Sequence, residues 1–395
     1  MQGAADNGQK AAAKEENVLY GILFPNGERN KKGIPSICSS NRYVIKAAFK
    51  KMAENGLPVI IESTANQVDQ FGGYTGMQPA DFARFVYDIA GEAGFPLEKL
   101  VLGGDHLGPL TFKSAPEEEA MAKAEALVAA YVAAGYSKIH IDTSMRLSCD
   151  DVNQPLETAV SAKRAARLVK ASEETFAKTR QGDAPLLYIV GSEVPVPGGA
   201  DEESIHVTTP EDFDKTVTIF KEQFEQAGIG EAFARVVGVV VQPGVEFGNY
   251  DIVDYNRAAA ASLTAALEKH SGIVFEGHST DYQITENLRR MAEDGIVIQK
   301  VGPAVTFAFR EAIYALEQIE KTVLQAGDTA SRLFETLDEV MLAEPKYWKA
   351  YYTGTEQDLA RERIFGLSDR CRYYLNDVNV EKALAQLIEN LGKRG

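Results

Sequence analysis

The sequence predicts an α/β protein, a TIM (β/α)8 barrel with an additional helical C-terminal segment. Short apolar or β-branched runs alternate along the chain with longer stretches of helical periodicity. The short runs are apolar throughout instead of alternating with polar residues, which is typical of parallel strands covered on both faces. Eight such units over roughly 260 residues match the usual length of a closed barrel.

Each predicted strand is one of these runs, and each of the first seven precedes a stretch long enough for a crossover helix. After the first run, for example, Ile45, Phe49 and Met52 recur with helical spacing before an Asn-Gly stop signal. An open doubly wound sheet is the rival fold, but no G-x-G-x-x-G pattern follows the first run. The eight runs are Ile34–Cys38, Leu57–Ile61, Leu100–Leu102, Lys138–Ile141, Leu186–Val190, Val236–Val241, Gly272–Phe275 and Ile296–Ile298.

The chain is expected to have three parts. Residues 1–17 form a disordered tail, residues 18–320 form the barrel, and residues 321–395 form a helical subdomain packed on the barrel. Aromatic residues are dense between Lys346 and Tyr352. Because aromatic residues are enriched at interfaces, a subunit interface or a lid is the alternative to simple packing.

Composition excludes several classes of function. A net charge of −16 argues against a nucleic-acid surface and against docking on anionic lipid. Three cysteines without C-x-x-C spacing argue against a disulfide framework and favour a reducing compartment. No apolar run reaches about 18 residues, and the start lacks the apolar core of a signal peptide. We therefore expect a cytoplasmic protein with no membrane span and a small-molecule substrate.

Two histidines fall at predicted strand ends, where the polar residues of a barrel meet at one mouth. They are His106 and His278, two of only five in the chain. With Glu193, which follows the fifth strand, they form the predicted ligand set for a divalent metal such as Zn, Ni, Mn or Co. The alternative for each histidine is a hydrogen bond at the barrel rim.

Asp105 and Asp142 are the predicted proton-transfer pair. Asp105 adjoins His106, and neighbouring strand residues point opposite ways, so both reach the mouth only if the strand is ending there. The alternative for Asp142 is the N-cap of the next helix. His140, two residues before Asp142, is expected to support the site from a deeper layer and not to bind the metal.

Lys300 precedes a Val-Gly-Pro sequence and a helical run, a pattern similar to the anion sites at helix N-termini in barrels. We therefore expect a substrate phosphate near Lys300 and Gly302. The alternative is a Schiff base between Lys300 and a sugar carbonyl, which would need no metal. Arg310 is expected to form a structural ion pair. The other residues assigned to substrate binding are Ser39, Glu62, Gln67, Gln242, Glu276 and Asp281.

Long motifs surround these residues. They are Glu62–Met77 (ESTANQVDQFGGYTGM), Gly103–Pro109 (GGDHLGP), Glu193–Gly199 (EVPVPGG), Val241–Phe247 (VQPGVEF) and His278–Gln283 (HSTDYQ). With them, the chain resembles the non-catalytic (Z-type) subunit family of class II tagatose-bisphosphate aldolase, from about Ile34 to the helical end. The resemblance implies either a partner that supports a separate aldolase subunit or a metal-dependent 4-epimerase of tagatose, fructose or their 6-phosphates. It also covers proteins described as tagatose 6-phosphate kinases, but this chain has no G-x-x-x-x-G-K-[ST] motif.

The chemistry of the sugar favours the epimerase. In a 2-ketose the hydrogen on C4 is not next to the carbonyl, so simple deprotonation cannot invert that carbon. Removing the proton of the 4-hydroxyl lets the C3–C4 bond break in a retro-aldol step, and rotation of the aldehyde half before the bond reforms inverts C4. The step needs a Lewis acid, an acid/base group and a closed pocket.

We therefore expect a metal-dependent 4-epimerase acting on a ketohexose or its 6-phosphate. The alternative is a non-catalytic stabilising subunit of class II D-tagatose-1,6-bisphosphate aldolase. The expected macromolecular partner is a second copy of the chain or an aldolase catalytic subunit.

Overall fold

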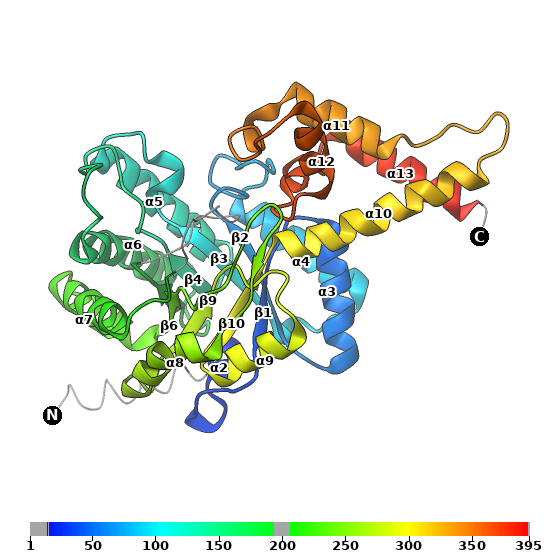
Figure 1. Ribbon diagram of the computed structural model, residues 1–395. Helices are drawn as coiled ribbons and strands as arrows, with labels where there is room; N and C mark the ends of the chain where they lie inside the picture. The colour runs from blue at the N-terminus through cyan, green and yellow to red at the C-terminus, as the bar shows by residue number, and fades with distance from the viewer. Residues whose placement is uncertain (1–13, 15, 193–205, 394–395) are drawn as a thin grey trace.

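A closed parallel barrel forms the centre of the molecule (Figure 1). The computed structural model describes residues 14, 16–192 and 206–393. Among these residues, eight strands close in the order β1-β10-β9-β6-β5-β4-β3-β2, which confirms the predicted (β/α)8 barrel. The barrel strands are β1 (Ile34–Cys38), β2 (Val59–Thr64), β3 (Leu100–Leu107), β4 (Lys138–Ile141), β5 (Leu187–Val190), β6 (Val236–Val241), β9 (Val274–Gly277) and β10 (Ile296–Val301).

A helix follows each barrel strand (Figure 1). The helices after the first seven barrel strands cover the outside of the barrel, and the helix after the last strand begins at the barrel and projects from it. Local sequence sets where these helices begin and end. In α3 the Asn41 side chain accepts hydrogen bonds from two free backbone N–H groups, and Gly56 ends the helix in the left-handed conformation. The helices are α3 (Arg42–Asn55), α4 (Pro79–Ala93), α5 (Glu117–Ala133), α6 (Thr158–Thr179), α7 (Pro210–Gln226), α8 (Arg257–Ala266), α9 (Thr285–Glu293) and α10 (Pro303–Val323). A small antiparallel pair, β7 (Glu246–Phe247) and β8 (Ile252–Val253), follows β6.

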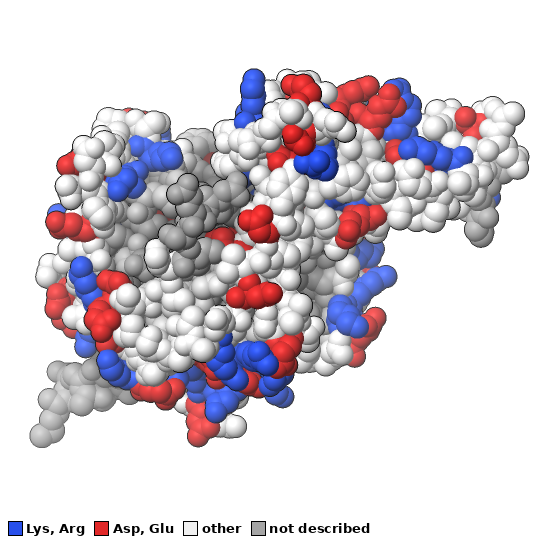
Figure 2. Space-filling view, viewed as in Figure 1, with Lys and Arg blue, Asp and Glu red and all other residues white. Residues whose placement is uncertain are grey.

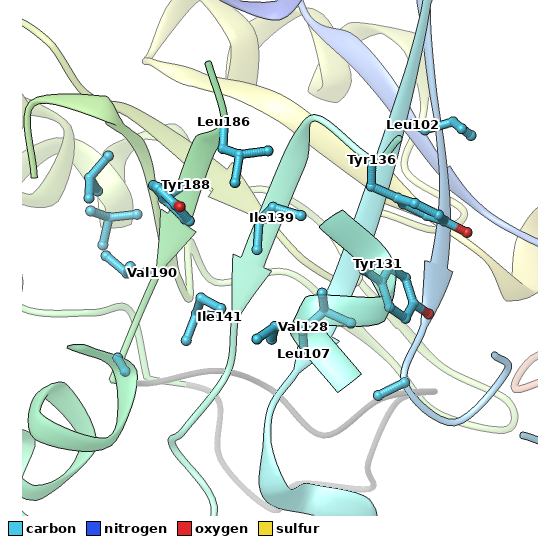
Figure 3. Close-up of a cluster of buried hydrophobic side chains, with 14 of the residues drawn as sticks. Leu102, Leu107, Val128, Tyr131, Tyr136, Ile139, Ile141, Leu186, Tyr188 and Val190 are labelled. Carbon is cyan, nitrogen blue, oxygen red and sulfur yellow. The ribbon is translucent and has the colours of Figure 1, made fainter. Parts of the chain in front are cut away.

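Two apolar layers hold the barrel together. The outer layer lies between strands and helices, and Figure 3 shows part of it, where Val128 and Tyr131 of α5 face the side chains of β3 and β4. The inner layer fills the end of the barrel at which the strands begin. There α2 (Val18–Leu23) inserts Leu19 and Leu23, both fully buried, and so closes that end.

Several strands run further than their apolar runs predict. β2 continues to Thr64, β3 to Leu107, β9 to Gly277 and β10 to Val301. The polar residues expected after these strands, Asp105 and Lys300 among them, are therefore part of the sheet itself. Within β3, glycine at position 103 leaves room for the Glu62 side chain, because a Cβ there would lie 2.5 Å from the Glu62 carboxylate.

An irregularity in β3 brings adjacent residues to the same cavity. The pairing of β3 with β4 shifts register between Gly104 and Leu107, and His106 has a left-handed φ of 49°. Such a shift re-aims side chains that regular alternation would point apart. As a result, Asp105 and His106 line one cavity even though they are neighbours inside a strand.

The C-terminal segment forms a third apolar core. It consists of α11 (Leu333–Ala343), α12 (Glu356–Phe365) and α13 (Val378–Gly392), with short turns η6 (Pro345–Tyr347) and η7 (Arg370–Tyr374). Helix α10 runs from the barrel into this core, and Figure 1 shows α10, α11 and α13 projecting together from the barrel. Arg310 of α10 pairs with Asp369 at 2.8 Å, which confirms the predicted ion pair.

Most of the predicted tail, residues 1–17, lies outside the described residues. Within the described ranges, no helix has the length and apolar character that crossing a membrane requires. On the face shown in Figure 2, acidic and basic side chains are interspersed.

A substitution at Gly108 tests the packing between β3 and the end of β4. A Cβ at this position would lie 1.7 Å from the carbonyl oxygen of Asp142, so Gly108→Ala must displace backbone. We expect a loss of roughly 1–3 kcal/mol or more in the free energy of unfolding, measured by urea titration. Gly272→Ala is the control, because its Cβ would meet no atom within 4 Å. Equal stability of the two variants would contradict this account of the packing.

Candidate functional site

A cavity opens at the carboxyl ends of the barrel strands. Of the residues predicted for the site, Gln67, Asp105, His106, His278, Asp281, Lys300 and Gly302 line it. The walls also contain residues that were not predicted: Cys38, Thr64, Asn66, Tyr74, Phe247, Ser279, Val301, Pro303, Arg372 and Tyr373. Tyr74 belongs to a motif at the end of β2, and the aromatic density of the C-terminal segment was the one signal for Tyr373.

Three imidazole rings meet beneath this cavity. The ring centroids of His106 and His278 are 5.1 Å apart, and that of His140 lies 5.2 and 5.3 Å from them. The two histidines predicted to share a cation are thus neighbours. His140, expected in a supporting role, lies equally close.

Four side chains could hold a metal ion. Asp105, His140, Glu276 and His278 each offer a ligand atom, and these atoms all lie within 4.8 Å of one another. His106 is not part of this group. Glu193, the predicted third ligand, lies outside the described residues, so its role stays a prediction.

An unsatisfied polar atom supports the fit of a cation to this group. Nε2 of His140 is buried and has no hydrogen-bond partner among the described residues, whereas Oε2 of Glu276 is paired with Lys138 at 2.7 Å. Buried polar atoms are nearly always satisfied, so this orphaned nitrogen points to a missing ligand. Two imidazoles with two carboxylates suit Zn²⁺ and the neighbouring transition metals.

The state of the imidazoles also suits a metal. Burial and the charge of Lys300 lower the pKa of His278 to about 3, so its ring is neutral at physiological pH. His140 Nδ1 lies 2.7 Å from Asp105 Oδ1 and 3.2 Å from the backbone nitrogen of His106, so Nε2 is the ring nitrogen without a partner among the described residues. A second ring nitrogen bonded to a carboxylate is the usual arrangement of a metal-bound histidine.

The charge of the buried layer also favours a divalent ion. Four carboxyl groups lie there, those of Glu62, Asp105, Asp142 and Glu276, and two ammonium groups, those of Lys138 and Lys300. Burial disfavours ionisation of Glu276, but Lys138 and the His278 hydrogen bond outweigh it and hold its pKa low. The carboxyl groups outnumber the ammonium groups there, and a divalent cation would offset this excess of negative charge.

Lys300 is held as an ammonium group. Its Nζ contacts Asp105 and lies 3.7 Å from Glu62. Burial alone would lower the pKa of Lys300, but Asp105 and the other acidic groups around it raise that pKa well above the ordinary value. A Schiff base requires a neutral amine, so these surroundings disfavour the metal-free alternative.

The N-terminus of α10 is already capped. The Asp281 carboxylate accepts hydrogen bonds from the backbone N–H groups of Gly302 and Ala304, at 3.0 and 2.7 Å. The helix end that was expected to bind a substrate phosphate near Lys300 and Gly302 therefore already holds a carboxylate of the chain. Burial is also the main reason that the pKa of Asp281 rises to about 6.

Asp142 lies behind His106. Its Oδ2 is 2.7 Å from Nδ1 of the ring, and Ser144 donates two hydrogen bonds to Oδ1. The pKa of Asp142 is low because the hydrogen bond and charge of His106 outweigh the effect of burial. Asp142 is not a helix N-cap, since α6 begins at Thr158. The pair has the geometry of an oriented acid/base imidazole.

The remaining predicted substrate-binding residues lie at different depths. Glu62 is fully buried and pairs with Lys138. Ser39 is buried after β1, where its hydroxyl accepts a hydrogen bond from Asn41 N–H. The Gln242 side chain accepts hydrogen bonds from the backbone N–H groups of residues 244 and 245. Ser39, Glu62 and Gln242 do not line the described cavity, and their assignment stays a prediction.

Known proteins resemble this chain over nearly its whole length. A family model described as "D-tagatose-1,6-bisphosphate aldolase subunit GatZ/KbaZ-like" matches residues 22–395. The "D-tagatose-1,6-bisphosphate aldolase subunit GatZ" of Salmonella heidelberg (strain SL476) is 48% identical over 361 residues, 91% of this chain and 84% of the relative. The corresponding protein of Salmonella agona (strain SL483) matches equally well.

One solved structure is similar in both sequence and fold. It is described as "a probable tagatose 6 phosphate kinase from Sinorhizobium meliloti 1021", with a TM-score of 0.84 and 45% identity. The match covers 91% of this chain and 88% of that chain. The similarity therefore extends over the barrel and the C-terminal segment together.

Removing one imidazole tests the metal group. We expect His278→Gln to weaken Mn²⁺ or Zn²⁺ binding at least about 100-fold in calorimetric titration, more than loss of an outer-shell group usually costs. His270→Gln is the matched control, because that imidazole pairs with Asp214 outside the group. Unchanged affinity in His278→Gln would show that the ion binds elsewhere.

Proposed function

The chain belongs to the D-tagatose-1,6-bisphosphate aldolase subunit GatZ/KbaZ-like family, and from this premise we propose that it is itself an enzyme. The proposed reaction is the metal-dependent 4-epimerisation of a ketohexose or its 6-phosphate, between tagatose and fructose forms. One observation carries the proposal: the buried group of Asp105, His140, Glu276 and His278 lies at the floor of a cavity, with His140 Nε2 unpartnered among the described residues.

The energetic cost of this arrangement supports a catalytic role. Burying ionised groups costs several kcal/mol each before pairing offsets it, and apolar residues of similar size are often more stabilising. A chain that served only as a scaffold would gain nothing from placing Glu62, Lys138 and Glu276 in the barrel with no exposed side-chain surface. Clusters of this kind are typical of sites that do chemistry.

The four ligand residues would hold a divalent cation at the floor of the cavity. When bound, the cation supplies Lewis-acid stabilisation of the negative charge that develops on the oxygens of the ketose. Lys300 lies beside this group as a fixed positive charge and lines the cavity. Its ammonium group adds to the stabilisation of an anionic sugar fragment.

His106 is the proposed proton carrier for the 4-hydroxyl. Its Nδ1 is hydrogen-bonded to Asp142, so the other ring nitrogen, Nε2, can accept the hydroxyl proton. The same nitrogen can return the proton after the aldehyde half has rotated and the C3–C4 bond has reformed. The Asp142 carboxylate stabilises the imidazolium that forms between these two transfers. This proposed role replaces the metal ligation predicted for His106. Asp142 then acts in proton transfer through His106, whereas Asp105, the other member of the predicted proton-transfer pair, belongs to the proposed metal group.

The walls of the cavity would retain the aldehyde half while it rotates. Tyr74 and Tyr373 are in contact, with ring centroids 4.8 Å apart. Phe247 of β7, which follows β6, also lines the cavity. Aromatic walls exclude water, which would otherwise compete for the proton and for the fragment. The C-terminal segment, through Tyr373, thus takes part in closing the site.

The two proposed roles separate in a pair of variants. We expect His106→Gln to lower kcat for epimerisation by roughly 100- to 10,000-fold while metal affinity stays near that of the parent chain. His278→Gln should lose both activity and metal. The measurements are sugar interconversion by chromatography and metal content of the purified protein. Loss of the metal in His106→Gln would instead restore the ligand role predicted from the sequence.

A second candidate function is support of a separate aldolase subunit. The descriptions of the relatives favour it, since the family model and the Salmonella proteins are named as subunits of D-tagatose-1,6-bisphosphate aldolase. In that case the partner would carry out the cleavage, and this chain would stabilise the partner. This chain has no G-x-x-x-x-G-K-[ST] motif, so its sequence gives no support to a kinase activity of the kind in the description of the solved relative.

One experiment separates the two candidates. The purified chain is incubated with Mn²⁺, Zn²⁺ or Ni²⁺ and with tagatose or tagatose 6-phosphate, and fructose products are sought by chromatography. We expect conversion by the chain alone. No conversion of either sugar, with cleavage of tagatose 1,6-bisphosphate enhanced only after addition of an aldolase catalytic subunit, would reject the epimerase in favour of the supporting subunit.

A further inference from the structure

We infer that η7 of the C-terminal segment forms an anion subsite with Arg372 and Arg370 as its cationic groups. The subsite lies beside the cavity at the carboxyl ends of the barrel strands, here called the reaction cavity. The ligand we assign to it is the terminal phosphate of a phosphorylated ketohexose. The sugar part of this assignment rests on the proposed function, whereas the anion subsite rests on the contacts of the two arginines.

Arg372 is a cation at the edge of the cavity without a carboxylate partner. Its guanidinium donates to the backbone oxygens of Ser368 and Asp369 and to the hydroxyl of Tyr373. No carboxylate oxygen in the described part of the chain lies within 4.0 Å of a guanidinium nitrogen of Arg372, which is the limit for an ion pair. The positive charge of Arg372 therefore lies in the cavity wall without a carboxylate partner among the described residues.

Arg370, two residues earlier, is similarly placed but more deeply buried. It is 3% exposed, and its Nε has no hydrogen-bond partner among the described residues. One Nη donates to the backbone oxygen of Tyr347, and the guanidinium lies over the Tyr351 ring, 3.1 Å from its centroid. Desolvation is the main reason that the pKa of Arg370 is lowered. An anion bound here would offset the free-energy cost of burying that charge.

Nearby arginines show that this lack of partners is specific. Arg310 pairs with Asp369 at 2.8 Å, and Arg363 of α12 pairs with Asp338. The same core thus supplies carboxylates to its structural arginines. Among the described arginines of this C-terminal core, Arg370 and Arg372 have no carboxylate partner, and both line cavities.

The two cavities share a wall. Arg370 lines a cavity of about 570 Å³ together with Lys113 and Lys346, and Arg372 lines the reaction cavity. Asn66, Tyr74 and Tyr373 line both. Asp69 is the one acidic residue in the described lining of the wider cavity, and its carboxylate already accepts two backbone N–H groups of its own loop. Lys346 is paired with Glu344, which leaves Lys113 and Arg370 as the cations of the wider cavity and keeps the balance of charge around the shared wall positive.

The other anion site of the mouth is not available, which strengthens this assignment. The N–H groups at the start of α10 are bonded to Asp281, and the Lys300 ammonium is held by Asp105. The cations of the mouth that have no carboxylate partner among the described residues are therefore those of η7. Guanidinium groups suit phosphate because several of their N–H groups can bind its oxygens at once.

Binding of an unreactive analogue tests the subsite without relying on catalysis. D-glucitol 6-phosphate, D-glucitol and D-gluconate are titrated calorimetrically into the full chain, with and without Mn²⁺. We expect the phosphate ester to bind at least about tenfold more tightly than glucitol, and Arg372→Gln to remove most of that difference. Arg370→Gln should weaken the ester in the same direction, and Arg372→Lys should retain part of its affinity.

Arg361→Gln is the control, because this exposed arginine of α12 pairs with Asp358. Thermal unfolding of each variant shows whether η7 is intact, and if Arg372→Gln unfolds, Arg370→Gln and Arg372→Lys decide. Equal affinity for glucitol and its phosphate, or unchanged ester binding in both glutamine variants, overturns the subsite. Gluconate bound as tightly as the ester overturns the choice of phosphate. Arginine-dependent ester binding by a chain without epimerase activity would reject the proposed function and leave the subsite standing.

Discussion

The ion pairs of Lys138 inside the barrel are the interaction on which the site depends. This side chain is fully buried in β4 and bridges Glu62 of β2 to Glu276 of β9. Leaving any one of these charges unpaired would cost several kcal/mol, so the three groups hold one another in place across the barrel. His278 is in turn 3.0 Å from Glu276, and Lys300 lies among the same carboxylates. The polar centre is therefore rigid before any ligand enters.

The irregular end of β3 adds the second half of the site. Regular alternation would send either Asp105 or His106 into the apolar layer outside the barrel. The register shift and the left-handed φ of His106 bring both to the cavity. Glycines at 103, 104 and 108 make this possible, since a Cβ at each would meet a neighbour at 2.6 Å or less. Strain of this kind is typically kept where function requires it.

The C-terminal segment completes the mouth of the barrel. Its own core is separate, yet η7 returns to the cavity and contributes Arg372 and Tyr373. The aromatic residues that suggested an interface or a lid are in part contact residues between this segment and the loop after β2, as the Tyr74–Tyr373 and Tyr74–Tyr347 contacts indicate. Packing and site formation are thus served by the same residues.

The sequence by itself determined the barrel, because eight buried parallel strands leave an apolar pattern that needs no knowledge of distant contacts. It also placed His106 and His278 at one mouth, since the strand ends of a barrel must converge. The tertiary structure decided which of these groups lie close together. His140 lies beside His278, and His106 turns to Asp142, because strand register and the shift in β3 set side-chain directions that sequence spacing does not encode.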